Sequence, residues 1–194
     1  MVTAARVGVF TCCTPKRWTA TAREVRMSVD NNGAVQHRDT WHIVTYDAND
    51  ERVAVTTFTE DEPIIFNRQI LNYRQRERYV IQGQQQQKCT RHPLTRPFHS
   101  ACVPGNTTEV YFARVGESNP GSSPGLWENT AYFYENDVAG YATVTMVDCA
   151  LVAEVAYGDL GGGAVSVNIQ YLNQTLNWVD PRAFALPPSC PTDP

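Results

Sequence analysis

Six cysteines are the residues of this sequence with the clearest chemical potential, because thiols form disulfides or bind zinc. They are spread from one end of the chain to the other, at Cys12, Cys13, Cys89, Cys102, Cys149 and Cys190. A common zinc site needs a C-x-x-C pair, which the chain lacks, and adjacent cysteines are poorly placed to bind one tetrahedral ion. The set therefore predicts disulfides, which at about 3% of the residues reinforce a packed core rather than replace it.

Motifs for catalysis are present only as fragments. The loop Gly121–Gly125 matches the G-x-S-x-G elbow of serine hydrolases, which needs a helix after its serine and a histidine downstream. No helical pattern follows, and all 4 histidines precede Ser123. Gly161–Gly163 lacks the Gly-Lys-Ser/Thr that completes a phosphate loop. We therefore expect a protein that is not an enzyme.

Two acidic turns, Asp30–Gly33 and Asp47–Glu51, concentrate the oxygen ligands that calcium prefers. Neither is an EF-hand; in the second turn Arg52 stands where that loop needs a glycine, and no glutamate occupies the twelfth place. Asp and Asn also close tight turns by bonding to their own backbone, which explains both clusters without a metal. Calcium held by several loops stays open as a cofactor, its ligands cannot be named from spacing, and no organic cofactor is expected.

Two N-x-Ser/Thr sequons begin at Asn106 and Asn173, and such sites are glycosylated only in a secretory compartment. Together with the cysteines they predict a secreted, extracellular glycoprotein, with the lysosomal lumen as the alternative. Residues Met1–Phe10 lack the apolar segment of a signal peptide, so we expect an exported form to be a mature or trimmed chain.

The composition of the 194 residues, 42% hydrophobic and 19% charged, predicts one globular domain. We expect it to span 1–194, with 1–11 as an N-terminal extension and 191–194 as a tail. The sequence has no 18-residue apolar run that could span a membrane. The 16 basic and 20 acidic residues give a net charge of -4 without a basic stripe, so nucleic acid is not an expected partner.

Period-two alternation dominates the chain and predicts β-strands, because alternate side chains of a strand point to opposite faces of a sheet. It is clearest over Val165–Tyr171, where apolar and polar residues alternate, and Asp30–Gly33 separates two such runs as a hairpin turn. The pattern predicts an all-β protein with about nine to eleven mainly antiparallel strands.

Four stretches interrupt the alternation. The proline-containing segments 92–108 and 118–125 predict exposed loops. One or two short helices are expected, near Pro63–Leu71 and at Asp180–Phe184.

Ordered landmarks along the chain resemble those of the ependymin-related family of secreted glycoproteins. They extend from Cys13 to Cys190: Cys13-Thr14-Pro15 with Trp18; Tyr46-Asp47 with Arg52-Val53; Lys88-Cys89 with Leu94-Thr95-Arg96-Pro97-Phe98; the sequon at Asn106; Trp127; Val147-Asp148-Cys149; and Asp180-Pro181-Arg182-Ala183-Phe184 ahead of Pro187-Pro188-Ser189-Cys190. The resemblance implies a fold related to LolA-type lipoprotein carriers, in which two curved, stacked antiparallel sheets form a half-barrel around a deep apolar pocket. It also implies a homodimer, N-glycosylation, and links to lipid and calcium binding.

The resemblance further implies, by position, that Cys13 pairs with Cys149 and Cys89 with Cys190. Vertebrate relatives have another cysteine near the segment Ile64–Phe66, with a partner beyond the C-terminal motif, and this chain has neither. Cys12 and Cys102 are left over and are expected to pair. Because Cys12 and Cys13 are adjacent, the exchange that joins Cys12 to Cys149 and Cys13 to Cys102 stays open.

The leading functional hypothesis is a non-enzymatic protein that holds a fatty acid or another lipid between its sheets, since side chains that leave a concave face unfilled leave room for a ligand. The candidate lining residues occupy alternating strand positions: Val25, Met27, Trp41, Ile43, Phe112, Tyr132, Tyr134, Val144, Met146, Val165, Val167 and Ile169. The alternative is a matrix, cell-adhesion or signalling factor that acts through its surface without a bound ligand.

Overall fold

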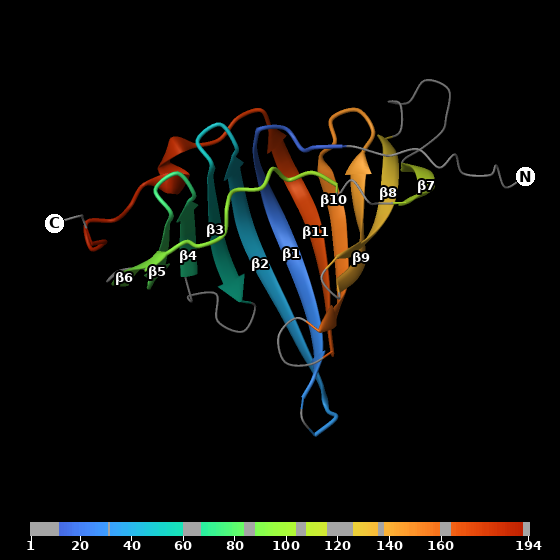
Figure 1. Ribbon diagram of the computed structural model, residues 1–194, viewed down its shortest axis with the longest axis horizontal. Helices are drawn as coiled ribbons and strands as arrows, with labels where there is room; N and C mark the ends of the chain where they lie inside the picture. Colours follow the sequence, from blue (N-terminus) through green and yellow to red (C-terminus); the bar gives the residue numbers. More distant parts are fainter. Residues whose placement is uncertain are drawn as a thin grey trace, which may run out of the picture. The chain divides into compact units, whose positions relative to one another are not determined.

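The computed structural model describes residues 12–30, 32–59, 67–83, 88–103, 108–115, 126–135, 138–159 and 164–191 (Figure 1). Its elements are eleven strands and one short 3-10 helix: β1 (Arg17–Val29), β2 (Val35–Asp47), β3 (Arg52–Thr59), β4 (Asn67–Asn72), β5 (Glu77–Gln82), β6 (Lys88–Pro93), β7 (Thr108–Val115), β8 (Leu126–Glu135), β9 (Val138–Thr145), β10 (Leu151–Asp159), β11 (Ala164–Leu176) and η1 (Pro181–Phe184). The described residues include no helix long and apolar enough to cross a membrane.

The strands form a single 11-stranded sheet in the order β6-β5-β4-β3-β2-β1-β11-β10-β9-β8-β7. Every ladder described from β2 to β6 and from β7 to β11 is antiparallel. The all-β prediction is therefore confirmed. The expected division into two stacked sheets is not found, because β1 and β11 pair with each other and continue one sheet.

The chain divides into two compact units that interleave along the sequence. Unit 1 comprises Met1–Thr14, Val25–Arg38 and Ala101–Gln170, and unit 2 comprises Pro15–Glu24, Asp39–Ser100 and Tyr171–Pro194. The strands β1, β2 and β11, each 13 residues long, contribute residues to both units. The expectation of one domain over 1–194 remains a prediction.

The core of unit 2 lies between β3–β5 and the C-terminal segment that carries η1. Its buried members are Ala54, Ile70, Tyr79, Ile81, Val179, Phe184 and Cys190. Pro181 begins η1 after Asp180, whose carboxylate accepts a hydrogen bond from Arg182 N at 3.0 Å, so the helix expected at Asp180–Phe184 is confirmed. The Arg52 guanidinium lies 4.1 Å from the centre of the Phe184 ring, which adds a cation–π contact to this packing.

A second set of packing contacts in unit 2 is made by aromatic rings. Trp18 stacks on Tyr46 at 5.4 Å between ring centres, and Tyr46 stacks on Phe98 at 5.8 Å. Phe98 also meets the edge of Tyr73 at 5.3 Å. The chain after β6, which crosses neighbouring strands in Figure 1, is thereby fixed to the sheet.

The helix expected near Pro63–Leu71 is wrong where the structure describes it, because residues 67–72 form β4. Ile70 pairs with Ala54 on one side and Tyr79 on the other and is only 4% exposed, so tertiary packing decides the local conformation. The loop expected over 92–108 begins later than predicted, since β6 extends to Pro93 on an edge of the sheet. The loop expected at 118–125 lies outside the described residues.

Three disulfides join Cys12 to Cys149, Cys13 to Cys102 and Cys89 to Cys190, and the described residues contain no free cysteine. The Cys89–Cys190 pairing is confirmed. The expected pairs Cys13–Cys149 and Cys12–Cys102 are wrong, and the exchanged arrangement that the sequence left open is present. The reason is that the extended backbone turns Cys12 inward, to 4% exposure, and leaves its neighbour Cys13 exposed beside Cys102, with which it also forms a β-bridge.

Candidate ligand-binding site

An apolar groove of about 430 Å³ lies in unit 1, between the β1–β2 hairpin and the adjoining ends of β10 and β11. Its lining residues are Met27, Ser28, Val29, Val35, Tyr157, Gly158, Ala164, Val165 and Ser166. They come from the end of β1, the start of β2, the end of β10 and the start of β11. The volume falls within the roughly 300–1,000 Å³ typical of ligand pockets.

Four large apolar side chains of this groove are exposed to solvent. Met27 is 47% exposed, Val29 44%, Val35 68% and Tyr157 46%. Single exposed apolar residues are ordinary on a protein surface, whereas a contiguous group around a concavity is typical of a binding site. An apolar ligand bound in the groove would cover these side chains and remove their apolar surface from water, which favours binding.

The turn between β1 and β2 fixes one wall of the groove. Asp30 N donates to Ala34 O at 2.9 Å, and the Asp30 carboxylate accepts from Asn32 N and Ala34 N, each at 2.9 Å. Gly33 has φ +80°, a left-handed conformation that glycine adopts without strain. The closed turn, at the lower end of Figure 1, sets Val29 and Val35 on its two sides.

The ladder between β10 and β11 fixes the other wall. Tyr157 pairs with Ser166, and Gly158 pairs with Val165. These pairs stand close to the end of the hairpin, where Asp159 pairs with Ala164. The wall is therefore positioned by backbone hydrogen bonds of the sheet and not by a loop.

The structure brings only two predicted pocket residues, Met27 and Val165, into this groove. Val144 is 1% exposed and belongs to the buried face of β9, together with Ala142. Ile43 is exposed outside the groove, and Trp41 lies under Arg23, 5.8 Å from the guanidinium carbon to the ring centre. None of these three residues lines the groove.

The remaining candidates do not line the groove where the structure describes them. Val25, Val167 and Ile169 are half-buried and do not line the groove. Tyr132 is exposed and packs against Tyr141 at 5.6 Å, and Met146 is exposed in the turn after β9; neither lines the groove. The side chains of Phe112 and Tyr134 lie outside the described part of the structure.

Sequence reasoning missed seven lining residues: Ser28, Val29, Val35, Tyr157, Gly158, Ala164 and Ser166. A signal was present for Val29, which continues the alternation of Val25 and Met27, and for Val35, the second residue after Gly33. The two serines and Gly158 carry no apolar signal, so only the sheet register could place them.

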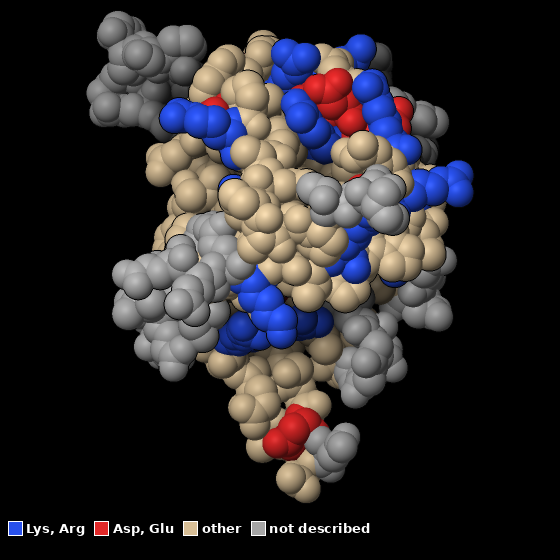
Figure 2. Space-filling view, turned by 90° about the vertical axis from the view of Figure 1, so that its left-hand side faces the viewer, with Lys and Arg blue, Asp and Glu red and all other residues tan. Residues whose placement is uncertain are grey.

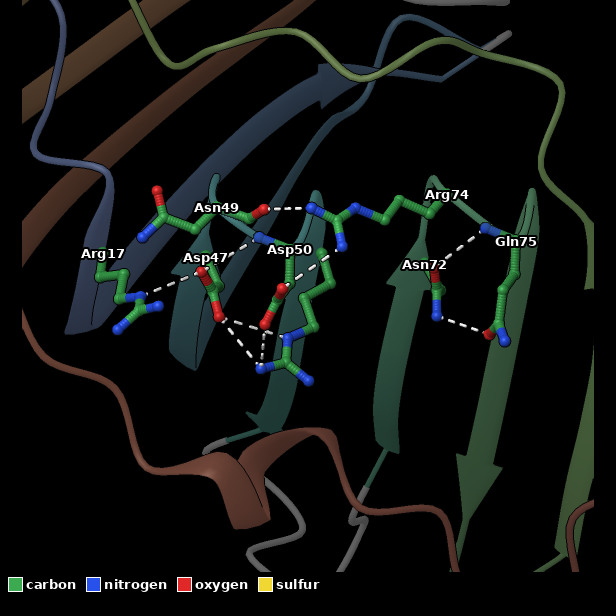
Figure 3. Close-up of polar contacts among 8 residues, drawn as sticks. Arg17, Asp47, Asn49, Asp50, Asn72, Arg74 and Gln75 are labelled. Atoms are coloured by element: carbon green, nitrogen blue, oxygen red, sulfur yellow. Dashed lines mark hydrogen bonds and ion pairs between the residues drawn. The ribbon is translucent and has the colours of Figure 1, made fainter.

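In the acidic turn Asp47–Glu51, a calcium candidate, arginine side chains contact the aspartates (Figure 3). Asp47 is 1% exposed, and its carboxylate accepts hydrogen bonds from Arg17 Nε at 3.3 Å and from Arg52 NH2 at 3.0 Å. Asp50 forms ion pairs with Arg52 at 3.0 Å and Arg74 at 3.5 Å. In the space-filling view the acidic side chains near the top of the molecule are flanked by basic ones (Figure 2).

Burial raises the pKa of Asp47, but the hydrogen bonds from Arg52 and Asp50 N and the positive charges of Arg52 and Arg17 outweigh it. The pKa of Asp47 therefore lies below its ordinary value of 3.8. In the other acidic turn, the backbone hydrogen bonds from Ala34 and Asn32 lower the pKa of Asp30.

Among the described residues no three His, Cys, Asp or Glu side chains are grouped to hold a metal ion. The carboxylates of Asp30, Asp47 and Asp50 are used in hydrogen bonds and ion pairs within the chain. Calcium binding remains a prediction of the resemblance, without a site among these residues.

The structure describes the asparagine of one of the two sequons. Asn173 is exposed in β11, with φ +49°, and its side chain is accessible to solvent. Asn106 lies outside the described residues.

The comparison with family models matches residues 61–190 to the ependymin family, which is more than half of the chain. No curated protein sequence matches the chain.

Three solved structures illustrate what the fold resembles. A LolA superfamily protein from Nitrosomonas europaea has a TM-score of 0.41 and 9% identity, covering 89% of this chain and 91% of that chain. PNGF-II has a TM-score of 0.35 and 11% identity, covering 91% of this chain but only 31% of its own. A DUF1329 family protein from Desulfovibrio piger has a TM-score of 0.28 and 10% identity, covering 89% and 90%.

Proposed function

The chain belongs to the ependymin family, and from that premise we propose that it is a secreted, non-enzymatic glycoprotein that binds a hydrophobic ligand of the lipid class. The observation that carries this proposal is the groove of unit 1, with Met27, Val29, Val35 and Tyr157 exposed along its walls. An acyl chain laid in the groove would remove these side chains from water, which is worth about 25 cal/mol for each Å² of apolar surface covered.

The site is tested by measuring the affinity of the protein for lipid through the displacement of a bound fluorescent fatty acid. We expect Val29→Glu to weaken binding at least tenfold, because the ligand would have to bury or displace an ionised carboxylate. The matched control is Ile43→Glu, since Ile43 is 43% exposed, close to the 44% of Val29, but lies outside the groove. Equal weakening in both variants, or no weakening in Val29→Glu, would reject the groove as the binding site.

A second measurement asks whether the protein carries a ligand when it is purified. Solvent extracts of the purified protein, analysed by mass spectrometry, are expected to contain lipid. If extracts contain none and no fluorescent fatty acid is displaced, the chain instead fits the alternative of a factor that acts through its surface.

Secretion is supported by the chemistry of the chain. Three disulfides are stable in an oxidising compartment, and the exposed Asn173 begins a sequon. Homodimer formation, calcium binding and matrix adhesion remain predictions of the family resemblance.

Glycosylation of Asn173 gives a direct check on the secretory pathway. Protein secreted from animal cells is expected to lose mass on enzymatic removal of N-glycans, and Asn173→Gln is expected to remove one glycan from the starting mass. Asn177→Gln serves as the control, because Asn177 is also exposed with a positive φ of 63° but begins no sequon. An unchanged mass for Asn173→Gln would show that this asparagine is not modified.

A further inference from the structure

The described residues that line the groove carry no ionic charge at neutral pH. Apart from valine, alanine, methionine and glycine, the lining offers the Tyr157 ring and the hydroxyls of Ser28 and Ser166. An ionised ligand group entering the groove would lose water without gaining a charged partner.

Two acidic residues that adjoin lining residues in the sequence also disfavour a negatively charged ligand group. Asp30 directly follows Val29, and Asp159 directly follows Gly158. The Asp30 carboxylate is ionised at neutral pH, and the hydrogen bonds from Ala34 N and Asn32 N lower its pKa further below its ordinary value of 3.8. A second negative charge brought to this end of the groove would be repelled.

The basic residues of the same hairpin stand outside the groove. Arg26, His37 and Arg38 are exposed, but none is among the lining residues.

We infer that the ligand of this groove is an electrically neutral lipid, with a hydroxyl or ester head group, rather than an ionised fatty acid. This inference rests on the proposed function, because it specifies the class of lipid that the same groove accepts. The serine hydroxyls can donate and accept hydrogen bonds to a neutral head group, and the apolar walls cover the chain.

Oleyl alcohol and oleate form a suitable pair of probes, since they share one acyl skeleton and differ in head-group charge. Both are titrated at pH 8 and below their aggregation concentrations against the displacement of one uncharged fluorescent lipid. We expect the wild-type protein to bind oleyl alcohol at least tenfold more tightly than oleate. Equal binding, or tighter binding of oleate, would overturn the inference while leaving lipid binding intact. Failure of both probes to bind would reject the proposed function itself.

A substitution that adds a cation to the wall locates the effect in the groove. Val35→Lys places an ammonium group at a lining position that is 68% exposed and therefore tolerant of a long side chain. We expect it to tighten oleate binding at least fivefold, while oleyl alcohol, which has no charge to pair with the ammonium group, binds no more tightly than to the wild type. The control is Val147→Lys, at an 84% exposed position outside the groove, which should change neither. The same oleate affinity in Val35→Lys and wild type would overturn the assignment of the head group to this groove.

Discussion

Replacing Cys89 and Cys190 together by alanine is expected to lower the free energy of unfolding by about 4 to 5 kcal/mol through chain entropy alone. The bond joins residues 101 positions apart, so its loss frees a long loop in the unfolded chain. Cys190 is also 6% exposed and packs in the core with Ile81 and Phe184, so lost packing adds about 1 kcal/mol more. Urea denaturation followed by tryptophan fluorescence measures the change.

The pair Cys13–Cys102 supplies the control for this experiment. Its sequence separation is 89, so the chain-entropy effect is nearly the same as for Cys89–Cys190. Cys13 is exposed, however, and its removal leaves a smaller packing defect. We expect the Cys13→Ala/Cys102→Ala protein to be the more stable of the two by about 1 kcal/mol. The reverse order would mean that the C-terminal segment does not depend on its disulfide for packing.

Substitution of Asp47 by asparagine is expected to cost about 1.5 to 3 kcal/mol of stability at pH 7, the range for lost hydrogen bonds to charged groups. The side chain is 1% exposed, and the change leaves the guanidinium groups of Arg17 and Arg52 without the carboxylate that they share. Asp50→Asn is the control, because Asp50 also binds Arg52 but is 44% exposed, and exposed ion pairs contribute about 1 kcal/mol or less. Similar losses in the two variants would contradict a special role for the buried carboxylate.

The same residue predicts how acid affects stability. The pKa of Asp47 is lower in the folded protein than its ordinary value of 3.8, so the folded state binds its proton less readily than the unfolded state. The stabilisation is complete well above pH 3.8 and is lost as the pH falls through the lower, folded-state pKa. The stability difference between wild type and Asp47→Asn is therefore expected to stay constant from about pH 5 to 7 and to shrink below 3.8. A difference that grows in acid would have the wrong sign.

Strands whose residues alternate in polarity could be predicted from the sequence, and strands without that alternation could not. Val165–Tyr171 alternates in polarity and lies within β11. In β4 the neighbours Ile70 and Leu71 are both apolar, so alternation is absent and only the pairing of Ile70 with Ala54 and Tyr79 shows which side is buried. The strand β6 consists mainly of polar residues at the sheet edge, where a strand needs no apolar face.

The disulfide exchange marks a different limit. Composition and spacing indicate that the cysteines pair, but adjacent residues of an extended chain point to opposite sides. The spacing from Cys12 and Cys13 to either partner differs by one residue, which no entropy argument can resolve. Burial of Cys12 and exposure of Cys13 decide the pairing, and burial is a property of the folded molecule.

The groove was predictable only in part, for a related reason. Alternation identifies Met27 and Val165 as members of apolar faces, but it equally selects Val144, whose side chain fills the core. What makes a groove is the meeting of two hairpin ends. That meeting depends on strand order, which brings β1 beside β11 although they are far apart in the sequence.

The adjacency of Cys12 and Cys13 has a practical consequence for mapping the covalent structure. Trypsin cleaves after lysine and arginine, and the fragment from Val7 to Lys16 contains both residues. Digestion without reduction therefore yields a single assembly of three peptides, in which this fragment holds those of Cys102 and Cys149 together. Both arrangements of the two bonds give an assembly of identical mass, so an intact-mass peptide map cannot distinguish the two disulfide pairings. Stepwise partial reduction with alkylation, or sequential degradation that opens the bond between residues 12 and 13, distinguishes them.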